Sequence, residues 1–525
     1  MLKLIIQSLI ELFYKLFSFL ENRRTQKVAE KHSSYALDEA HNSITDAHIL
    51  KQLKDHSDES AFNLLENNLQ AFISRCKLIK NAQKTLDLQY YYFHGDTSGR
   101  LIAQLLIEAA NRGVRVRLLL DDIDTIGADE PIRILNAHPD IEIRIFNPFY
   151  FRGLLRYAEF ITDLSRVGRR MHNKTMIADN FQAVIGGRNI GDIYFAVDPE
   201  LLFLDIDLLS IGPIVKKISI SFDEYWNSRW AIPVDHLYTR PDKLYAQSRI
   251  KLFLKRRIQD VALADYEGAL HASCFSENIN QDDFPLVWSD AQLFYDEPAK
   301  IAEREFDVVR QLKNDLHEIV NSATQEITII SPYFVPGAQG LAWFKNVVAK
   351  GIKINVFTNS LAATDVVAVH AGYTVYRHEL LQAGVNLYEL KPSAYARERK
   401  KFKLLRAGSR ASLHAKTMIV DQAKVFIGSP NLDPRSIELN TEIGMLVNDR
   451  TLAMQVMKMF EGIAEPRNSY KLEISQDDNS NQNKNIIWKS QENGVAKVYR
   501  SDPQASLWRK LSVLVFRLLP MEEFL

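Results

Sequence analysis

The chain has little cysteine and no excess charge of either sign. Cys76 and Cys274 are the only cysteines in 525 residues, and neither has the CxxC or Cys/His spacing of a metal site. Both lie in stretches that contain apolar residues, which favours buried free thiols. Lysine plus arginine and aspartate plus glutamate number 65 each, so the basic excess typical of nucleic-acid-binding proteins is missing. These absences argue against a cysteine-metal protein and against a nuclease.

The rest of the composition is that of an ordinary globular protein. Hydrophobic residues make up 46% and charged residues 25% of the chain, so a large buried core is possible. The length exceeds what one hydrophobic core usually supports. We therefore expect two domains.

The two ends of the chain are apolar but carry spaced charges. Residues 1–24 form an amphipathic pattern in which Lys3, Glu11 and Lys15 share one helical stripe. A charge near the centre of a spanning helix costs about 2.5–3.5 kcal/mol, which favours a helix lying in the membrane interface. No small-residue cleavage site follows. A similar pattern runs from Leu507 to Leu518. For each end the alternative is a helix that packs on the protein's own core.

An internal repeat relates the two halves of the chain. Residues 77–93 and 318–334 each read as the end of a helix, a polar turn and a buried strand. Each is followed by an apolar-periodic helix that a glycine ends, at Gly113 or Gly351, and then by another strand. Strand, helix, strand implies parallel strands joined by crossover helices. The sequence thus predicts a duplicated α/β fold.

A longer motif occurs once in each half. It has the form H-x-K-x4-D-x6-G-[GS]-x-N, and the second copy follows the first at one constant offset. The first copy, residues 172–189, contains His172, Lys174, Asp179 and Asn189. The second, residues 414–431, contains His414, Lys416, Asp421, Ser429 and Asn431. Histidine and lysine two residues apart on a strand project to the same side. A single histidine on a strand is often a core residue, but two complete copies indicate chemistry.

This doubled motif resembles the signature of the phospholipase D superfamily, from about residue 71 to residue 446. The resemblance implies two α/β/α domains related by a pseudo-two-fold axis, with mixed, largely parallel sheets, one shared active site and no metal or other cofactor. We expect the first domain at 25–240, a connecting segment at 241–303 and the second domain at 304–525, after the membrane-associating helix at 1–24. The polar run 474–485 reads as a loop, and Asn493-Gly494 as a hairpin turn.

The resemblance also implies a mechanism. One imidazole attacks phosphorus while the other protonates the leaving alcohol, and a phosphohistidine intermediate results. By analogy His172 is the nucleophile and His414 the general acid. The residues implied to be catalytic are His172, Lys174, Asp179, His414, Lys416 and Asp421. Those implied to support the site or bind phosphate are Asn189, Ser429, Asn431, Asp205 and Glu442.

Three of these assignments have alternatives. An acidic residue is expected to hold the second ring nitrogen of each histidine, and Glu442 and Asp205 are the candidates. Asp205 aligns with Glu442 better than Asp207 does. Asp207 is otherwise a solvated strand residue. Asp179 and Asp421 can serve structure instead of chemistry.

A narrower resemblance concerns longer stretches. Residues 119–127, 137–149, 185–195 and 365–390 are similar to bacterial cardiolipin synthases of the C type. This implies transfer of a phosphatidyl group from a donor phospholipid to phosphatidylglycerol, with phosphatidylglycerol or phosphatidylethanolamine as donor, at the surface of the bacterial inner membrane. No nucleic acid is expected, and no protein partner is indicated. The alternatives are a phospholipase D-type hydrolase and a nuclease or phosphodiesterase.

Two further groups of residues are candidates for the lipid head-group pocket. The first is His370, Tyr373 and Arg377. The second is Asp121, Asp122 and Asp124, which lie at the end of a predicted parallel strand. For each, a local hydrogen-bonded network is the alternative.

Overall fold

The computed structural model describes most of both halves of the chain. The described residues are 31–37, 52–149, 151–153, 156, 159, 163–197, 200–238, 241–256, 286–302, 310–394, 410–475 and 486–518. The predicted helix at 1–24 and Cys274 therefore lie outside them, as does most of the predicted loop 474–485. Cys76 is a buried free thiol, and burial raises its pKa to about 12.

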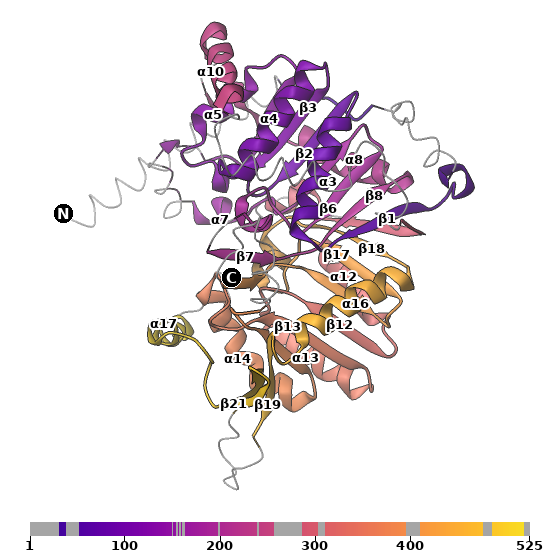
Figure 1. Ribbon diagram of the computed structural model, residues 1–525, viewed down its shortest axis with the longest axis vertical. Coiled ribbons are helices and arrows are strands. Elements are labelled where there is room, and N and C mark those ends of the chain that lie inside the picture. Colours follow the sequence, from indigo (N-terminus) through magenta and orange to yellow (C-terminus); the bar gives the residue numbers. More distant parts are fainter. Residues whose placement is uncertain are drawn as a thin grey trace, which may run out of the picture.

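Two large mixed sheets dominate the molecule, one in each half (Figure 1). The first has the order β10 (Val287–Ser289), β1 (Ser60–Leu65), β8 (Asp207–Ile211), β6 (Gln182–Gly186), β5 (Thr175–Ala178), β2 (Thr85–Tyr90), β3 (Arg115–Asp121), β4 (Ile141–Phe146), β9 (Ala231–Pro233). The second has the order β11 (Ala291–Tyr295), β18 (Ile443–Val447), β17 (Lys424–Gly428), β16 (Thr417–Val420), β12 (Glu326–Ile330), β13 (Lys353–Asn359), β14 (Asn386–Leu390), β19 (Ser469–Ile474), β20 (Ile486–Glu492), β21 (Val495–Tyr499). From β8 to β4 and from β18 to β14 the two orders correspond strand by strand, which confirms the duplication.

The expectation of largely parallel sheets is wrong. Among the described strands of the first sheet only β2–β3 and β3–β4 are parallel, and among those of the second only β12–β13 and β13–β14. These are the pairs that helices connect, and a crossover helix is what parallel neighbours require. The strands that carry the motifs are instead joined by tight turns, as in β5–β6 and β16–β17, so they pair antiparallel. The repeat detected in the sequence covers only the parallel part of each sheet.

Helices cover both sheets. The principal ones are α3 (Asn68–Asn81), α4 (Thr97–Asn111), α5 (Asp129–Asn136), α8 (Pro213–Asn227), α10 (Lys243–Arg256), α12 (Leu312–Asn321), α13 (Gly337–Ala349), α14 (Val367–Ala383), α16 (Arg450–Ala464) and α17 (Leu507–Arg517). The predicted glycines end α4 and α13 in the left-handed conformation, with φ of 89° at Gly113 and 85° at Gly351. Among the described helices, none has the length and apolar character needed to cross a bilayer.

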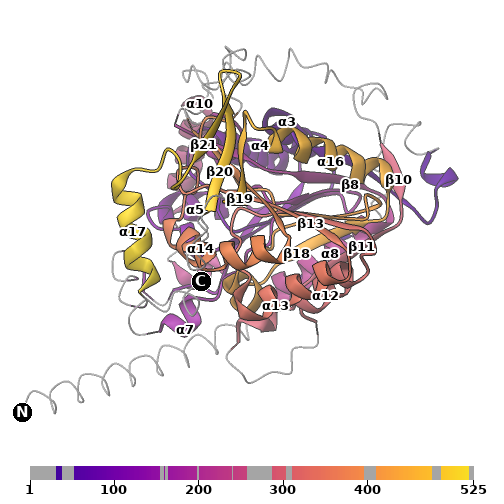
Figure 2. The same cartoon turned by 90° about the horizontal axis from the view of Figure 1, so that it is seen from below.

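The hydrophobic core between the sheets belongs to both halves. One cluster of buried side chains includes Phe222 and Trp226 of α8 from the first half and Phe460 of α16 from the second. Two further clusters lie on the outer faces, one in each half, under α3 and α4 and under α13 and α14. Figure 2 shows the same stacking of helices and sheets from below. Because the central cluster is shared, the two halves are held as one body around the surface where they meet.

The segment predicted as a connector, 241–303, contributes to both sheets. It contains α10, and it supplies β10 to the first sheet and β11 to the second, with one residue between them. The predicted hairpin turn is confirmed, because Asn493 and Gly494 join β20 to β21 with φ of 48° and 84°.

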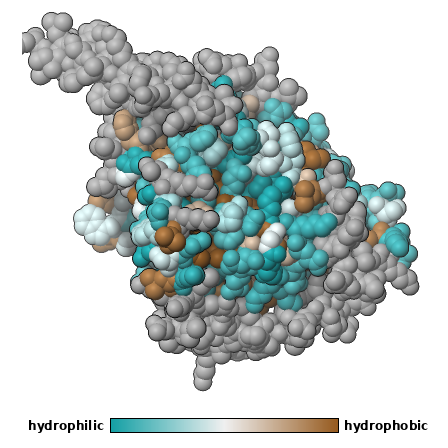
Figure 3. All heavy atoms as spheres, turned by 90° about the horizontal axis from the view of Figure 1, so that it is seen from above, coloured by the Kyte–Doolittle hydropathy of each residue, from teal (hydrophilic) through white to brown (hydrophobic). Residues whose placement is uncertain are grey.

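Figure 3 looks onto the end occupied by the first half, where the described surface is mainly hydrophilic with scattered apolar side chains.

Candidate active site

The two motif histidines lie where the halves meet, in extended segments and not in strands. His172 and Lys174 come just before β5, and His414 and Lys416 come just before β16. All four are buried. The histidine and lysine of each motif therefore lie in extended backbone just before the strand. The amide of each histidine takes no part in the hydrogen bonds of the two large sheets. Each segment can then pair with the other half of the molecule.

Backbone pairing between the halves fixes both segments. β7 (Leu201–Leu204) of the first half runs parallel to β15 (Arg410–Leu413) of the second, and the amide of His414 donates to the carbonyl oxygen of Leu204 at 2.8 Å. At the symmetric position Met171 bridges to Thr441, and the amide of His172 donates to the carbonyl oxygen of Thr441 at 2.9 Å. Each histidine is thus aligned with the residue that precedes the other half's acidic candidate.

The acidic residues hold the histidines across this junction. His172 Nδ1 lies 2.9 Å from Glu442 Oε2 and 3.0 Å from Oε1, and His414 Nδ1 lies 2.6 Å from Asp205 Oδ2. Both carboxylates are buried. An acceptor at Nδ1 places the proton there and leaves Nε2 with its lone pair. The arrangement therefore presents two imidazoles of defined tautomer, each oriented by the opposite half.

The second small residue of the G-[GS] pair differs between the halves because the acids differ. A Cβ at Gly187 would lie 2.2 Å from Asp205 Oδ1, so only glycine leaves room for this carboxylate. At the matching position the hydroxyl of Ser429 donates to Glu442 and accepts from the amide of Ile443 at 3.0 Å. Glu442 consequently has a hydroxyl donor at the position where Asp205 faces a glycine.

Burial and the two ammonium groups determine the charge of the histidines. Burial, followed by Lys174 and Lys416, lowers the pKa of His172 well below its ordinary value. Burial and then Lys416 lower the pKa of His414 to about 4. Without substrate both imidazoles are neutral near pH 7. A bound phosphodiester anion would raise both histidine pKa values because it adds a negative charge beside them.

The lysines and carboxylates are shifted by the same environment. Burial lowers the pKa of Lys416 to about 8 and lowers that of Lys174 well below its usual range. Burial raises the pKa of Glu442 to about 7. For Asp205 burial acts in the same direction, but His414 and Lys416 outweigh it and lower the pKa below its ordinary range. Asp205 is therefore the firmly ionised partner of the two.

Aromatic rings that the sequence reasoning missed form the walls around the histidines. The ring of Tyr91 meets His172 edge-on with 4.9 Å between centroids, and Lys174 Nζ lies 5.4 Å from the same ring. His414 stacks on Phe203 at 4.7 Å and meets Tyr194 edge-on at 5.2 Å. The run of three tyrosines at 90–92, at the end of a buried strand, was the available signal for the first wall.

The two motif asparagines are both buried close to these walls. Asn189 Nδ2 donates to the hydroxyl of Tyr194 at 2.8 Å, and its Oδ1 accepts from the amide of Tyr92 at 3.1 Å. Asn431 is buried too, and among the described atoms its Oδ1 has no hydrogen-bond partner. The amide group of Asn189 is thus already engaged within its own half.

The contacts of Asp179 and Asp421 are with backbone amides of neighbouring strands, which favours the structural alternative over the predicted catalytic role. Asp179 follows β5 at the end opposite His172, and its carboxylate accepts from the amides of Gln83, Lys84 and Thr85 at 2.8–2.9 Å. Asp421 accepts in the same way from the amides of residues 324–326. Each aspartate thus anchors the start of β2 or β12, and a catalytic role for either stays a prediction.

The remaining candidates form local networks. Asp207 is not solvated. It is buried and pairs with Arg75 at 2.9 Å and Arg188 at 3.1 Å. Arg377 is paired with Glu389 at 3.1 Å and with Asp502 at 2.9 Å.

The three aspartates at the end of β3 have different contacts. Asp122 is paired with Arg152 at 2.6 Å. Asp121 touches the site, because its carboxylate accepts from the amide of Met171 at 2.9 Å. Asp124 lies 3.7 Å from His94.

Two duplicated α/β halves that meet on a doubled H-x-K motif have the architecture of the phospholipase D superfamily. A sequence model of the family described as "Cardiolipin synthase, PLD-like domain" matches residues 76–226 and 316–464. The chain belongs to this family of phospholipase D-like phosphatidyltransferases.

Comparison with individual proteins points to the same family. The chain is 40% identical to cardiolipin synthase C of Escherichia coli over 474 residues, which cover 90% of this chain and 98% of that one. It is 26% identical to cardiolipin synthase A of Pseudomonas syringae over 75% of this chain and 67% of that one. A solved structure of phosphatidylserine synthase from Haemophilus influenzae superposes with a TM-score of 0.51 at 14% identity, covering 80% of this chain and 91% of that chain. This last likeness concerns the fold.

Proposed function

We propose that the protein makes cardiolipin by transferring a phosphatidyl group from a donor phospholipid to a hydroxyl group of phosphatidylglycerol. The observation that carries this proposal is the similarity to cardiolipin synthase C, which extends over nearly the whole length of that relative. The pair of cross-held imidazoles supports it, because transfer between two alcohols needs a nucleophile on one side of phosphorus and a proton carrier on the other.

In the first half of the proposed reaction, His172 Nε2 attacks the phosphorus of the donor. A P–N bond forms and the P–O bond to the head-group alcohol breaks, while His414 gives its proton to the departing oxygen. The neutral state of His172 suits attack, since only the unprotonated nitrogen has a lone pair. His414 gains its proton after the phosphodiester anion has bound, helped by the ionised Asp205 at its Nδ1.

In the second half, His414 removes the proton from a hydroxyl of phosphatidylglycerol, and that oxygen displaces His172 from phosphorus. The bound phosphodiester anion would raise the pKa of Lys174 and Lys416, as it does that of the histidines. The two ammonium groups then supply positive charge beside the imidazoles, where the equatorial oxygens of phosphorus accumulate negative charge. Asn431 supplies a further donor through its amide nitrogen. With two phosphatidylglycerol molecules the products are cardiolipin and glycerol, and the enzyme returns to its starting state.

Hydrolysis is the second candidate function, because water in place of the second alcohol would give phosphatidic acid by the same steps. The experiment is incubation of the purified protein with labelled phosphatidylglycerol, with and without phosphatidylethanolamine, followed by separation of the lipids. We expect labelled cardiolipin as the main product and none from His172→Ala or His414→Ala. Phosphatidic acid alone would identify a hydrolase, and no lipid product at all would overturn both assignments.

The proposed location is the surface of the bacterial inner membrane. α17 supports it, because its apolar side chains point outward: Leu507 is 83% and Trp508 79% exposed, and Leu511 and Leu514 are exposed as well. Val513 is its buried contact with the body of the protein. An apolar face with a tryptophan and flanking basic residues suits insertion at the level of the lipid head groups. This exposure favours membrane docking over the alternative of a core helix, although Val513 packs on the protein.

Vesicle binding tests this location. Trp508→Glu combined with Leu511→Glu should lower the partition coefficient on phosphatidylglycerol vesicles by at least about tenfold, since each side chain loses apolar burial. Val495→Glu combined with Val498→Glu is the matched control, because these exposed valines lie on the β21 strand. Equal loss in both variants, or none in either, would exclude α17 as the docking element.

A further inference from the structure

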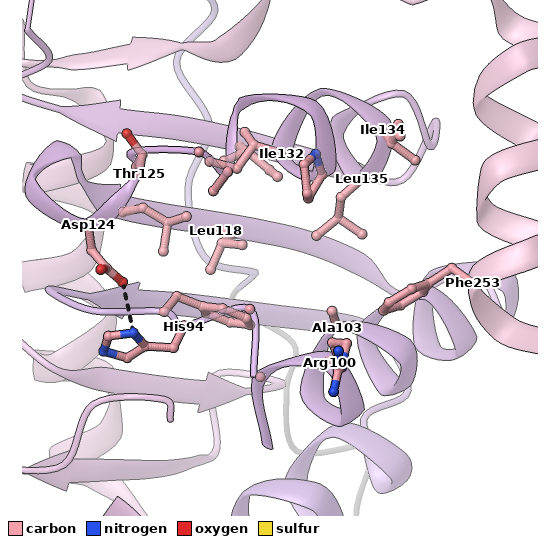
Figure 4. A pocket seen from close by; sticks show the side chains of 18 of the residues that line it. His94, Arg100, Ala103, Leu118, Asp124, Thr125, Ile132, Ile134, Leu135 and Phe253 are labelled. Atoms are coloured by element: carbon pink, nitrogen blue, oxygen red, sulfur yellow. Dashed lines mark ion pairs between the residues drawn. The ribbon is translucent and has the colours of Figure 1, made fainter. Parts of the chain in front are cut away.

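A large apolar cavity lies in the first half, directly behind the catalytic histidine. Its volume is about 540 Å³, within the range of ligand pockets. Its walls come from four elements, with Leu118 on β3, Ala103 on α4, Leu135 on α5 and Phe253 on α10 among the lining side chains. Figure 4 shows these side chains facing one another across the cavity. Because most of the lining is apolar, an apolar ligand would make packing contacts with these walls.

The cavity and the active site share a wall. Tyr91 lines the cavity, and the same ring meets the imidazole of His172 and lies under Lys174. Asp121 lines it too, and accepts a hydrogen bond from the residue that precedes His172. This apolar space therefore adjoins the position of a molecule whose phosphorus is bonded to His172.

The two ends of the cavity differ in polarity. His94 and Asp124 stand together at one end, 3.7 Å apart, and Phe253 stands at the opposite end (Figure 4). The close approach of His94 is built into the chain, since a Cβ at Gly99 would lie 1.8 Å from the carbonyl oxygen of His94. This gradient matches an amphipathic ligand with its polar end near the histidines and its chain directed toward α10.

The wall at the Phe253 end of the cavity is α10, which has apolar residues on two faces. Ile250 and Phe253 of α10 pack against the core of the first half, while Leu244 is 76% and Leu252 41% exposed. Leu252 also lines the cavity. Figures 1 and 2 show α10 on the same side of the molecule as α17, the proposed membrane-docking helix. A chain leaving the bilayer on this side would pass α10 on its way to the cavity.

We propose that this cavity binds one acyl chain of the phospholipid whose phosphatidyl group is transferred to His172. The inference rests on the proposed function, because it requires a long-chain lipid as the substrate of that histidine. Its consequence is that the rate depends on the length of the donor's chains and not only on its head group.

A cavity-filling substitution tests this. Ala103 faces the cavity from α4, and Ala103→Phe would occupy part of it without touching the histidines, lysines or carboxylates. Ala342→Phe is the matched control, because Ala342 is exposed on α13, the helix that corresponds to α4 in the second half. The measurement is release of glycerol by the purified full-length protein from detergent-dispersed phosphatidylglycerol with either hexanoyl or palmitoyl chains.

We expect Ala103→Phe to lower kcat/KM for the palmitoyl lipid by at least about tenfold relative to the hexanoyl lipid, while Ala342→Phe changes neither. Retained activity on hexanoyl lipid also shows that the variant is folded. Equal effects on both lipids, or no effect, would overturn the inference. Glycerol is released in transfer and in hydrolysis alike, so a wild-type protein that releases glycerol without forming cardiolipin would contradict the proposed function and leave this comparison valid.

A cross-linking measurement gives a second readout. A phosphatidylglycerol with a photoreactive group at the end of one acyl chain should label the peptide that contains Leu252 and Phe253, and Ala103→Phe should reduce that label several-fold. Label of equal intensity in wild type and Ala103→Phe would contradict the cavity as the site of the chain.

Discussion

At the scale of the residue, the proposed active site consists of two imidazoles and two carboxylates, one of each from either half. Each imidazole is held by a carboxylate that the other half supplies, and the backbone amide of each histidine is bonded to the residue before that carboxylate. The two pairs are not equivalent. Asp205 is firmly ionised, whereas burial raises the pKa of Glu442 to about 7 and Ser429 donates to it. This difference bears on which histidine attacks.

The first prediction concerns the nucleophile. With a p-nitrophenyl phosphodiester, whose leaving group needs no proton, His414→Ala should form one phosphohistidine per molecule and stop, because the step that releases it needs His414 as base. His172→Ala should form none. Intact-protein mass spectrometry and peptide mapping under alkaline conditions would locate the group. Label on His414 in His172→Ala would reverse the assignment.

The second prediction concerns Glu442. Its folded pKa of about 7 lies above its unfolded value of about 4.3, so its contribution to stability is complete below pH 4 and is lost as the pH rises through 7. Glu442→Gln removes this dependence. We expect the Tm difference, variant minus wild type, to grow between about pH 5 and pH 8, while activity falls by at least about a hundredfold for want of the orienting carboxylate.

Asp205→Asn is the control for this prediction because its sign is opposite. The folded pKa of Asp205 is lowered, so its contribution to stability is present above its unfolded pKa and is lost only as the pH falls below that value. Asp205→Asn should therefore lower Tm at pH 7 and above. The same pH dependence in both variants would refute the inequality of the two pairs.

At the scale of the element, the motif is a device for building each half of the site and for anchoring its sheet. Its histidine and lysine precede β5 or β16, and its aspartate follows the same strand and holds the start of β2 or β12. One short strand thus separates the chemical end of the motif from its structural end. The spacing between lysine and aspartate is set by the length of that strand.

The third prediction separates these roles. Asp179→Ala removes three hydrogen bonds from backbone amides to a buried carboxylate, so it should lower the free energy of unfolding by about 2 kcal/mol or more, with kcat within about threefold of wild type. Asp421→Ala is the counterpart in the second half. Thermal unfolding and steady-state rates measure both quantities. Unchanged Tm with abolished turnover would return Asp179 to the catalytic residues.

Local sequence patterns predicted the elements that follow local rules. The helices ended by Gly113 and Gly351, the turn at Asn493-Gly494 and the βαβ units are all found, since each depends on neighbours along the chain. The antiparallel part of each sheet was missed, because β1–β8 and β11–β18 pair residues far apart in sequence. The walls at Tyr194 and Phe203 were missed for the same reason.

Some features of the candidate site could likewise be predicted from the sequence and others could not. The histidines and lysines were evident from the doubled spacing, and Glu442 and Asp205 from their place after the motif. That each carboxylate serves the opposite histidine followed from no local pattern, because pairing between the halves decides it. Asp179 and Asp421 share the motif's spacing with the histidines, so spacing alone could not show that they face away.

At the scale of the whole molecule, the two halves share both a hydrophobic core and a site. The central cluster contains Phe222 from the first half and Phe460 from the second, and β7 pairs with β15 across the junction. Neither half buries this surface alone. The site therefore exists only when both halves are folded and joined.

The fourth prediction follows from this sharing. Calorimetric unfolding of the purified protein in detergent should show one transition whose calorimetric and van't Hoff enthalpies agree. Asp179→Ala and Asp421→Ala, which weaken different halves, should each shift that one transition downward. If the halves unfold independently, two transitions should appear and each variant should move only its own.

The two halves carry different residues, Gly187 and Ser429, at equivalent positions beside the carboxylates. This difference limits how such a site can arise. Two identical subunits related by a true two-fold axis must carry the same residue at this position, so both carboxylates would have equal surroundings and either histidine could begin the reaction. A single chain holding both copies is free to place glycine beside Asp205 and serine beside Glu442. Fusion of the copies thus permits a division of labour between chemically identical imidazoles that an exact dimer cannot have.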